Sequence, residues 1–202
     1  MTGAWLILPT YNEAENIEAI VHAARGTLRE GDQILIVDDN SPDGTGRIAD
    51  ALAQELGNVE VLHRPGKSGL GRAYLAGFAR ALEGGAEYLI EMDADFSHDP
   101  GDLPRLIAEA EQGADLVLGS RYVEGGGVTD WGLMRRLISR GGSLYARAVL
   151  HVDVRDLTGG FKCFRRHVLE TLDLKSIHAD GYGFQIEMTY RAIRAGFRVV
   201  EI

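Results

Sequence analysis

Two aspartates at the end of an apolar run are the residues of this chain best suited to chemistry. Asp93 and Asp95 lie in the segment Glu-Met-Asp-Ala-Asp-Phe-Ser-His-Asp-Pro, residues 91–100. In an extended chain, residues two apart point to the same side, so both carboxylates can converge on one point. Such a pair suits Mg²⁺ or Mn²⁺, which keeps open positions for phosphate oxygens. Ser97 and His98 follow closely enough to complete or orient that shell.

A second interpretation of the same segment is a solvated acidic turn, because Asp and Pro are both common turn formers. The Asp-x-Asp pattern alone does not separate a metal site from a turn. The choice between the two depends on the strands and helices that would position these carboxylates.

The first 120 residues predict strands that alternate with helices. Apolar runs indicate strands at 4–9, 33–38, 59–63, 88–92 and 115–119. Helical spacing indicates helices at 12–25, 44–56, 70–82 and 102–111, with Asp43 preceding the second of them. Further along, we expect a strand at 159–165, a helix at 184–195 and a strand-like run at 197–202. This pattern predicts an α/β fold with a mostly parallel central sheet and helices on both faces.

Polar clusters follow the predicted strands at the same end of each. Ligands of such sheets bind outside the carboxyl ends of the strands, so the clusters predict one site at that edge. Their ranges are 9–13, 38–45, 64–67, 93–95 and 120–122.

The glycine-rich segment 66–71 matches neither of two common phosphate-binding motifs. A P-loop ending at Gly66-Lys67-Ser68 needs a glycine where Val61 stands, and a dinucleotide fingerprint starting at Gly69 needs one where Tyr74 stands. We interpret the segment as a helix entry to which Lys67 or Arg72 contributes positive charge.

Composition is that of one folded domain of 202 residues, 45% hydrophobic and 25% charged. The net charge of −9 argues against nucleic acid as a general partner. No apolar run approaches the ~18 residues of a membrane span, and the run 4–8 is too short for a signal peptide. The single cysteine, Cys163, excludes an internal disulfide, fits a reducing cytoplasm and is expected to be a small buried filler.

The segment 131–150 is basic and apolar in an otherwise acidic chain. It follows the glycine joint 125–127, and it carries four arginines and no acidic residue. Such a segment suits an anionic membrane surface or a lipid head group. The alternative is a surface helix packed on the main sheet.

Six motifs, taken together and in order, resemble the family 2 inverting glycosyltransferases of the GT-A fold. The resemblance is narrower to the members that transfer mannose to dolichyl or other polyprenyl phosphates. The motifs span nearly the whole chain, at residues 9–13, 38–45, 93–98, 119–122, 159–162 and 181–187.

The resemblance implies a GDP-mannose donor, a polyprenyl (dolichyl) phosphate acceptor and Mg²⁺ or Mn²⁺. It also implies a single GT-A domain, 1–202, with a nucleotide-sugar-binding half, 1–122, and an acceptor-binding half, 123–202. We expect a cytoplasmic protein attached peripherally to the inner face of the membrane, with or without a membrane-spanning partner.

The roles that the resemblance implies fall on particular residues. Asp95 and Arg121 are expected to be catalytic, Asp93, Asp95 and Ser97 to surround the metal, and Lys162 to contact the donor phosphate. The remaining sugar-donor contacts fall on Ala94 and on Glu187, for which a structural role at the helix start is the alternative. Guanosine contacts fall on Pro9, Tyr11, Glu13, Val37 and Asp39, and acceptor-phosphate contacts on Arg121, Arg135 and Ser139.

Two other functions remain open on sequence alone. One is a transferase of glucose or N-acetylglucosamine from a UDP-sugar to a lipid or glycan; the other is a catalytically silent nucleotide-sugar-binding subunit. Members of the resembled family usually continue past the strand that ends at Ile202, with a further cationic segment near the active site. If the chain ends at Ile202, we expect this segment to be either missing or supplied elsewhere, and activity would depend on which holds.

Overall fold

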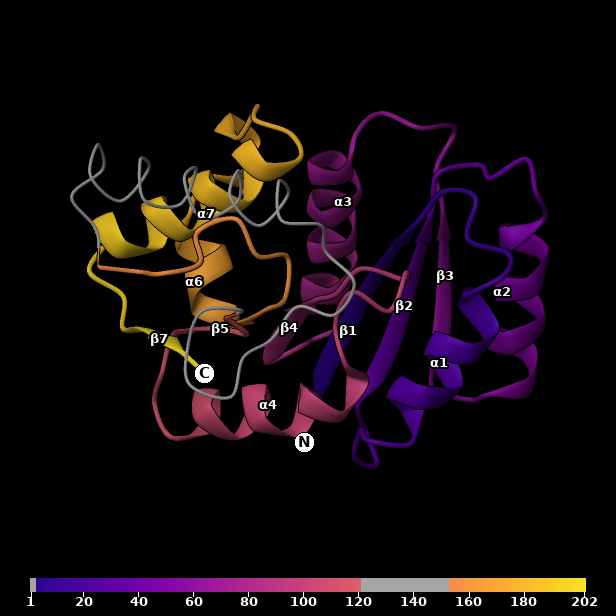
Figure 1. Cartoon of the computed structure of the whole chain (residues 1–202), viewed down its shortest axis with the longest axis horizontal. Helices are drawn as coiled ribbons and strands as arrows, with labels where there is room; N and C mark the ends of the chain where they lie inside the picture. Colours follow the sequence, from indigo (N-terminus) through magenta and orange to yellow (C-terminus); the bar gives the residue numbers. More distant parts are fainter. Residues whose placement is uncertain (1–2, 121–152) are drawn as a thin grey trace, which may run out of the picture.

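A computed structural model describes residues 3–120 and 153–202 of the chain, and these residues form one α/β unit (Figure 1). Its sheet has the strand order β3-β2-β1-β4-β6-β5-β7. The strands are β1 (Ala4–Thr10), β2 (Gln33–Asp38), β3 (Val59–His63), β4 (Tyr88–Glu91), β5 (Leu116–Leu118), β6 (Lys162–Arg165) and β7 (Val199–Glu201). The helices are α1 (Ile17–Arg25), α2 (Thr45–Glu55), α3 (Leu70–Glu83), α4 (Leu103–Glu111), α6 (Arg166–Thr171) and α7 (Tyr182–Arg194), with short 3₁₀ turns η1 (Pro100–Asp102) and η2 (Leu174–Ser176).

The sheet is mostly parallel, as the alternating pattern predicts. Strands β1, β2, β3 and β4 run parallel, whereas β6 is antiparallel to both β4 and β5. The chain leaves β1 to one side, through β2 and β3, and then returns to place β4 on its other side. This reversal makes the carboxyl ends of β1 and β4 a topological switch point, where α/β sheets bind ligands.

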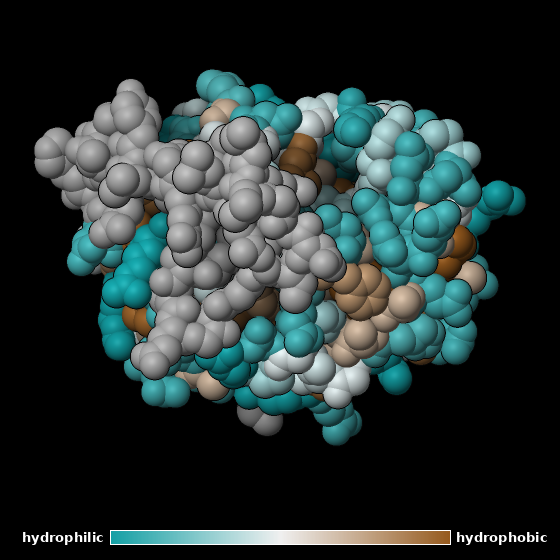
Figure 2. Space-filling view, viewed as in Figure 1, coloured by the Kyte–Doolittle hydropathy of each residue, from teal (hydrophilic) through white to brown (hydrophobic). Residues whose placement is uncertain are grey.

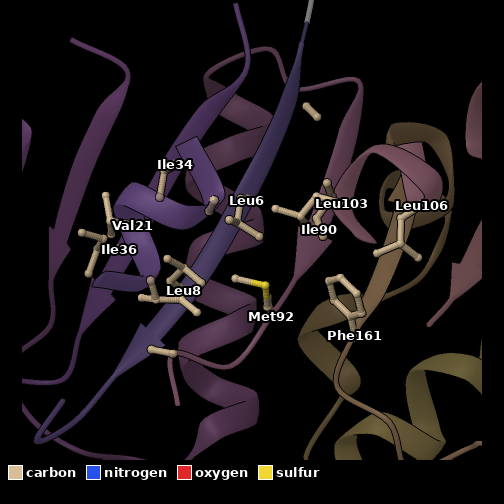
Figure 3. Packing of buried hydrophobic residues seen from close by; sticks show 14 of the residues in the cluster. Leu6, Leu8, Val21, Ile34, Ile36, Ile90, Met92, Leu103, Leu106 and Phe161 are labelled. Carbon is tan, nitrogen blue, oxygen red and sulfur yellow. The ribbon is translucent and has the colours of Figure 1, made fainter. Parts of the chain in front are cut away.

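Alternate side chains of β1 build the two halves of the core. Leu6 and Leu8 lie in a cluster with Val21 of α1 and Leu106 of α4 (Figure 3). On the opposite face, Trp5 and Ile7 pack with residues of α3, α6 and α7. Helices therefore cover both faces, because every second residue of a strand points to the same side.

The helix predicted from Asn12 begins five residues later, at Ile17. Asn12 has a left-handed φ of 62°, which a helix cannot include. The backbone N–H groups of residues 12, 13 and 14 donate to the side chains of Ser41, Thr45 and Asp43, respectively. These bonds tie the end of β1 to the loop after β2, and the sequence pattern contains no signal for such side-chain partners.

The other predicted strand and helix boundaries differ from the observed ones by fewer residues than the start of α1 does. The strand predicted at 159–165 is confirmed only from Lys162, α7 starts two residues before the predicted position, and α6 was missed because six residues carry little periodicity. The predicted basic segment 131–150 and the glycine joint 125–127 lie outside the described residues. Where the structure does describe the chain, no helix is both long and apolar enough to cross a membrane.

A charged pair is buried where β4 meets β6. Glu91 and Lys162 are register partners across these antiparallel strands, and both are fully buried. The Lys162 ammonium donates to the side-chain and backbone oxygens of Gln185 at 2.6 and 2.8 Å. Burial raises the pKa of Glu91 to about 7 and lowers the pKa of Lys162 to about 8, each opposed by the charge of the other.

The close packing of α3 on the sheet generates one stability prediction. A Cβ on Gly77 would lie 2.5 Å from Ile7 Cγ2 and 3.2 Å from Val37 Cγ2. We expect Gly77→Ala to lower the free energy of unfolding by about 1–2 kcal/mol, because overpacking outweighs the gain in helix propensity. Gly57→Ala, with no heavy atom within 4 Å of its added Cβ, is the control. Equal denaturant midpoints for the two variants would contradict the prediction.

The buried pair of Glu91 and Lys162 generates a second stability prediction. Lys162→Met should destabilise the fold by about 3–5 kcal/mol, because it leaves the Glu91 carboxyl buried without its counter-charge. Adding Glu91→Gln to that variant should recover at least about 1 kcal/mol, measured in urea as a double-mutant cycle. The exposed Lys175→Met is the control, expected to stay within about 0.5 kcal/mol of the parent protein. Additive effects of the two core substitutions would show that the charges are not coupled.

Candidate active site

A cleft of about 270 Å³ lies at the carboxyl ends of β1, β2 and β4 and beside the start of α3. Seven of the residues predicted from sequence to form the site line it: Pro9, Tyr11, Glu13, Asp39, Asp93, Ala94 and Asp95. The remaining lining residues are Thr10, Lys67, Gly69, Leu70 and Ala73. The cleft thus occupies the switch point of the sheet.

Asp93 and Asp95 reach the cleft because β4 ends at Glu91 and the chain turns there. Asp93 is partly exposed, and its Oδ1 accepts a hydrogen bond from the Tyr74 hydroxyl at 3.0 Å. Asp95 is exposed, and its Oδ1 accepts from the backbone N–H of Ser97 at 2.9 Å. Between them and Ser97, Phe96 takes a left-handed φ of 59° and is 46% exposed.

The other side of the cleft holds an aromatic ring and a buried carboxylate. Lys67 Nζ lies over the ring of Tyr11, 4.2 Å from its centre. Asp39 is almost fully buried, and its Oδ1 accepts from Arg64 Nη1 at 2.5 Å. A partly exposed aromatic ring beside an anchored carboxylate can hold a planar base with hydrogen-bonding edges.

Charge in the cleft is strongly one-sided. Four of the lining side chains are carboxylates, from Glu13, Asp39, Asp93 and Asp95, whereas Lys67 brings the one ammonium group among the lining residues. An anion such as a diphosphate would be repelled here unless a cation came with it. In the described part of the chain no three His, Cys, Asp or Glu side chains cluster to hold a metal by themselves. Mg²⁺ and Mn²⁺ fit this donor set nevertheless, because such ions are held by one or two carboxylates together with substrate phosphates.

Four predicted site residues of the described chain do not line the cleft: Val37, Ser97, Lys162 and Glu187. Val37 is buried, and its side chain faces α3. Lys162 is bonded to Gln185 in the interior, so a contact with a donor phosphate would require it to leave that partner. Glu187 on α7 pairs with Arg191 at 2.5 Å. For these four residues the predicted ligand contacts stay predictions, including the metal contact of Ser97. The same holds for Arg121, Arg135 and Ser139, which lie outside the described residues.

Several residues that build the cleft carry no signal for ligand binding in the sequence. Gly69, Leu70 and Ala73 belong to the start of α3, and they line the cleft because that helix packs against β1 and β2. Lys67 was predicted only as one of two alternatives; the other, Arg72, points its guanidinium to His178 at 3.3 Å. Tyr74 appeared only as a mismatch to a glycine motif. Its pKa is raised well above the usual value by burial and by the neighbouring carboxylates, first Asp93, so the hydroxyl stays protonated.

Two curated bacterial proteins are similar to this chain over nearly all of its length. One is the undecaprenyl-phosphate mannosyltransferase of Micrococcus luteus, 50% identical over 97% of this chain and 80% of its own. The other is the polyprenol monophosphomannose synthase of Mycolicibacterium smegmatis, 48% identical over 98% of this chain and 74% of its own.

A solved structure shares the fold at much lower sequence identity. Glucosyl-3-phosphoglycerate synthase from Mycobacterium tuberculosis, in complex with Mn²⁺, uridine diphosphate and phosphoglyceric acid, superposes with a TM-score of 0.74. The two chains are 20% identical, over 99% of this chain and 68% of the other. This likeness confirms the predicted α/β fold class.

The family model of glycosyl transferase family 2 matches residues 5–173 of this chain. That match covers well over half of the chain, and it includes the loops after β1, β2 and β4 that line the cleft. The chain belongs to glycosyl transferase family 2.

Proposed function

We propose that this chain transfers mannose from GDP-mannose to a polyprenyl phosphate, giving polyprenyl-phosphate β-mannose and GDP. The observation that carries the proposal is the 50% identity, over 97% of the chain, to a protein named undecaprenyl-phosphate mannosyltransferase. The cleft supports it independently, since paired aspartates and an aromatic base platform meet at the switch point of the sheet.

The donor would lie across the cleft from Tyr11 to Asp93. Its base would stack by Tyr11, and Asp39 and Glu13 offer carboxylate oxygens to N–H groups of a guanine or to ribose hydroxyls. The diphosphate would then approach Asp93, Asp95 and Lys67. Asp93 and Asp95 would hold Mg²⁺ or Mn²⁺, which when bound supplies positive charge to the departing diphosphate.

A phosphate acceptor does not require the protein to supply a strong general base. A phosphate monoester has a second pKa of about 6, so it is already an anionic nucleophile at neutral pH and needs no strong general base. One of its oxygens forms a bond to the anomeric carbon while the bond from that carbon to the diphosphate oxygen breaks. Attack from the face opposite to the leaving group inverts an α-linked donor to a β-linked product.

Holding two anions together requires positive charge, which we assign to Arg121 and Arg135, and a hydrogen-bond donor, which we assign to Ser139. Arg121 and Asp95 are the catalytic residues of this proposal. Arginine binds phosphate with a planar pair of donors. Arg135 and Ser139 are four residues apart, so one helix face would present both to the same phosphate. We also propose that the basic segment 131–150 attaches the protein peripherally to an anionic membrane surface on the cytoplasmic side.

A transfer assay tests the function and the metal together. Protein, a short polyprenyl phosphate and Mn²⁺ are mixed with labelled GDP-mannose, UDP-glucose or UDP-N-acetylglucosamine, and lipid is extracted. Label should enter the lipid phase from GDP-mannose alone, and EDTA should abolish transfer. We expect Asp95→Ala to lower kcat by at least about 100-fold, whereas Asp102→Ala, at an exposed carboxylate of η1, keeps parental activity. Transfer from a UDP-sugar, or an active Asp95→Ala enzyme, would refute the proposal.

The acceptor assignment predicts a different kinetic signature for Arg135→Ala. Loss of a charge-assisted bond to phosphate should raise the KM for polyprenyl phosphate at least about tenfold and leave the KM for GDP-mannose nearly unchanged. Arg105→Ala, which removes an exposed arginine from α4, is the matched control. Parental lipid kinetics in the Arg135→Ala enzyme would contradict the assignment.

A further inference from the structure

Tyr74 joins helix α3 to the carboxylate at the centre of the cleft. Its hydroxyl donates to Asp93 Oδ1 at 3.0 Å, across 19 positions of sequence. The residue itself is fully buried, although Asp93 is partly exposed. The bond therefore runs from a rigid interior group to a side chain that lines the ligand cleft.

Two aromatic rings hold Tyr74 in place. Phe184 of α7 stacks parallel to it, with ring centres 6.0 Å apart and 3° between the planes. Phe78, one turn further along α3, lies 6.2 Å away at 26°. A fully buried ring packed against two others keeps its rotamer, so the position of the hydroxyl is set by the core rather than by solvent.

A fixed donor on Oδ1 also determines where the second carboxylate oxygen of Asp93 lies. Asp93 Oδ2 lies near Gly160, where an added Cβ would be only 3.4 Å from it, and 3.9 Å from His98 Nε2. Rotation of the carboxylate about its Cβ–Cγ bond would break the bond from Tyr74. The hydrogen bond thus holds Oδ1 in place and with it the direction in which Oδ2 points.

We propose that Tyr74 is a positioning residue that orients the Asp93 carboxylate for the divalent cation bound with the nucleotide. The inference rests on the proposed function, because it takes Asp93 as a ligand of that cation. Partners that orient a metal-binding carboxylate change metal affinity or activity by 10–100-fold when they are removed. A hydroxyl that served only to satisfy a buried polar group would change stability and leave metal affinity unaltered.

The test measures Mn²⁺ binding to the purified full chain with saturating GDP, following free Mn²⁺ by electron paramagnetic resonance. Tyr74→Phe should weaken Mn²⁺ binding about tenfold or more, and the Mn²⁺ concentration for half-maximal transfer should rise by a similar factor. The KM for polyprenyl phosphate should stay unchanged. Tyr88→Phe, the same chemical change on β4, is the matched control and should bind Mn²⁺ as the parent protein does.

Replacement with unnatural amino acids separates the hydrogen bond from packing and keeps the test decisive if Tyr74→Phe folds poorly. With 4-methylphenylalanine at position 74 the space of the hydroxyl stays filled but no donor remains, so Mn²⁺ binding should weaken as in Tyr74→Phe. With 4-aminophenylalanine the donor returns, and affinity should recover to within about threefold of the parent value. Equal Mn²⁺ affinity of these two variants would overturn the inference.

Asp93→Asn distinguishes failure of this inference from failure of the proposed function. Loss of Mn²⁺ binding in Asp93→Asn together with parental binding in Tyr74→Phe would overturn the role of Tyr74 alone. Parental Mn²⁺ binding in Asp93→Asn would remove Asp93 from the metal site, and with it both the metal assignment and this inference. Weakened binding in both variants is the result we expect.

Discussion

The contact between α3 and the sheet is the constraint on which most of the site depends. Gly77 lets the helix lie directly against Ile7 of β1 and Val37 of β2, because a larger residue would meet their methyl groups. Because α3 lies so close to the sheet, its first residues form one wall of the cleft. The hydroxyl of Tyr74, in the same helix, donates a hydrogen bond to Asp93. A helix held further from the sheet would still cover an apolar face, but it would lose both of these contacts with the ligand edge.

The charged pair buried in the interior, Glu91 and Lys162, differs in its surroundings from the carboxylates that line the cleft. Glu91 ends β4 in the interior, where burial raises the pKa of its carboxyl, and Lys162 and the side chain of Gln185 oppose that rise. Two residues later the chain reaches the partly exposed Asp93, where water and ligands can act. A short stretch of chain therefore passes from a low-dielectric interior to a solvated edge, and neighbouring carboxyl groups differ in character because of their surroundings rather than their type.

Sequence reasoning predicted the fold class and the edge of the sheet that carries the site, because strand runs and the placement of polar clusters depend on local pattern. It also predicted Asp93, Asp95, Tyr11 and Asp39 as neighbours in one site, since parallel strands bring their carboxyl ends together. It missed the late start of α1, which depends on hydrogen bonds to side chains some 30 residues away. It could not find Tyr74, because a tyrosine at helical spacing in an apolar stripe is typical of an ordinary core residue.

Under the proposed function, the excess of carboxylates in the cleft would make cation and nucleotide binding mutually dependent. Without a diphosphate, Asp93 and Asp95 offer a divalent cation few of the oxygen ligands it requires, and the described residues hold no third clustered ligand. Without the cation, the diphosphate meets carboxylates on both sides and a single lysine among the lining residues. Each ligand lowers the electrostatic cost of binding the other, so their affinities must be coupled, and reciprocally so.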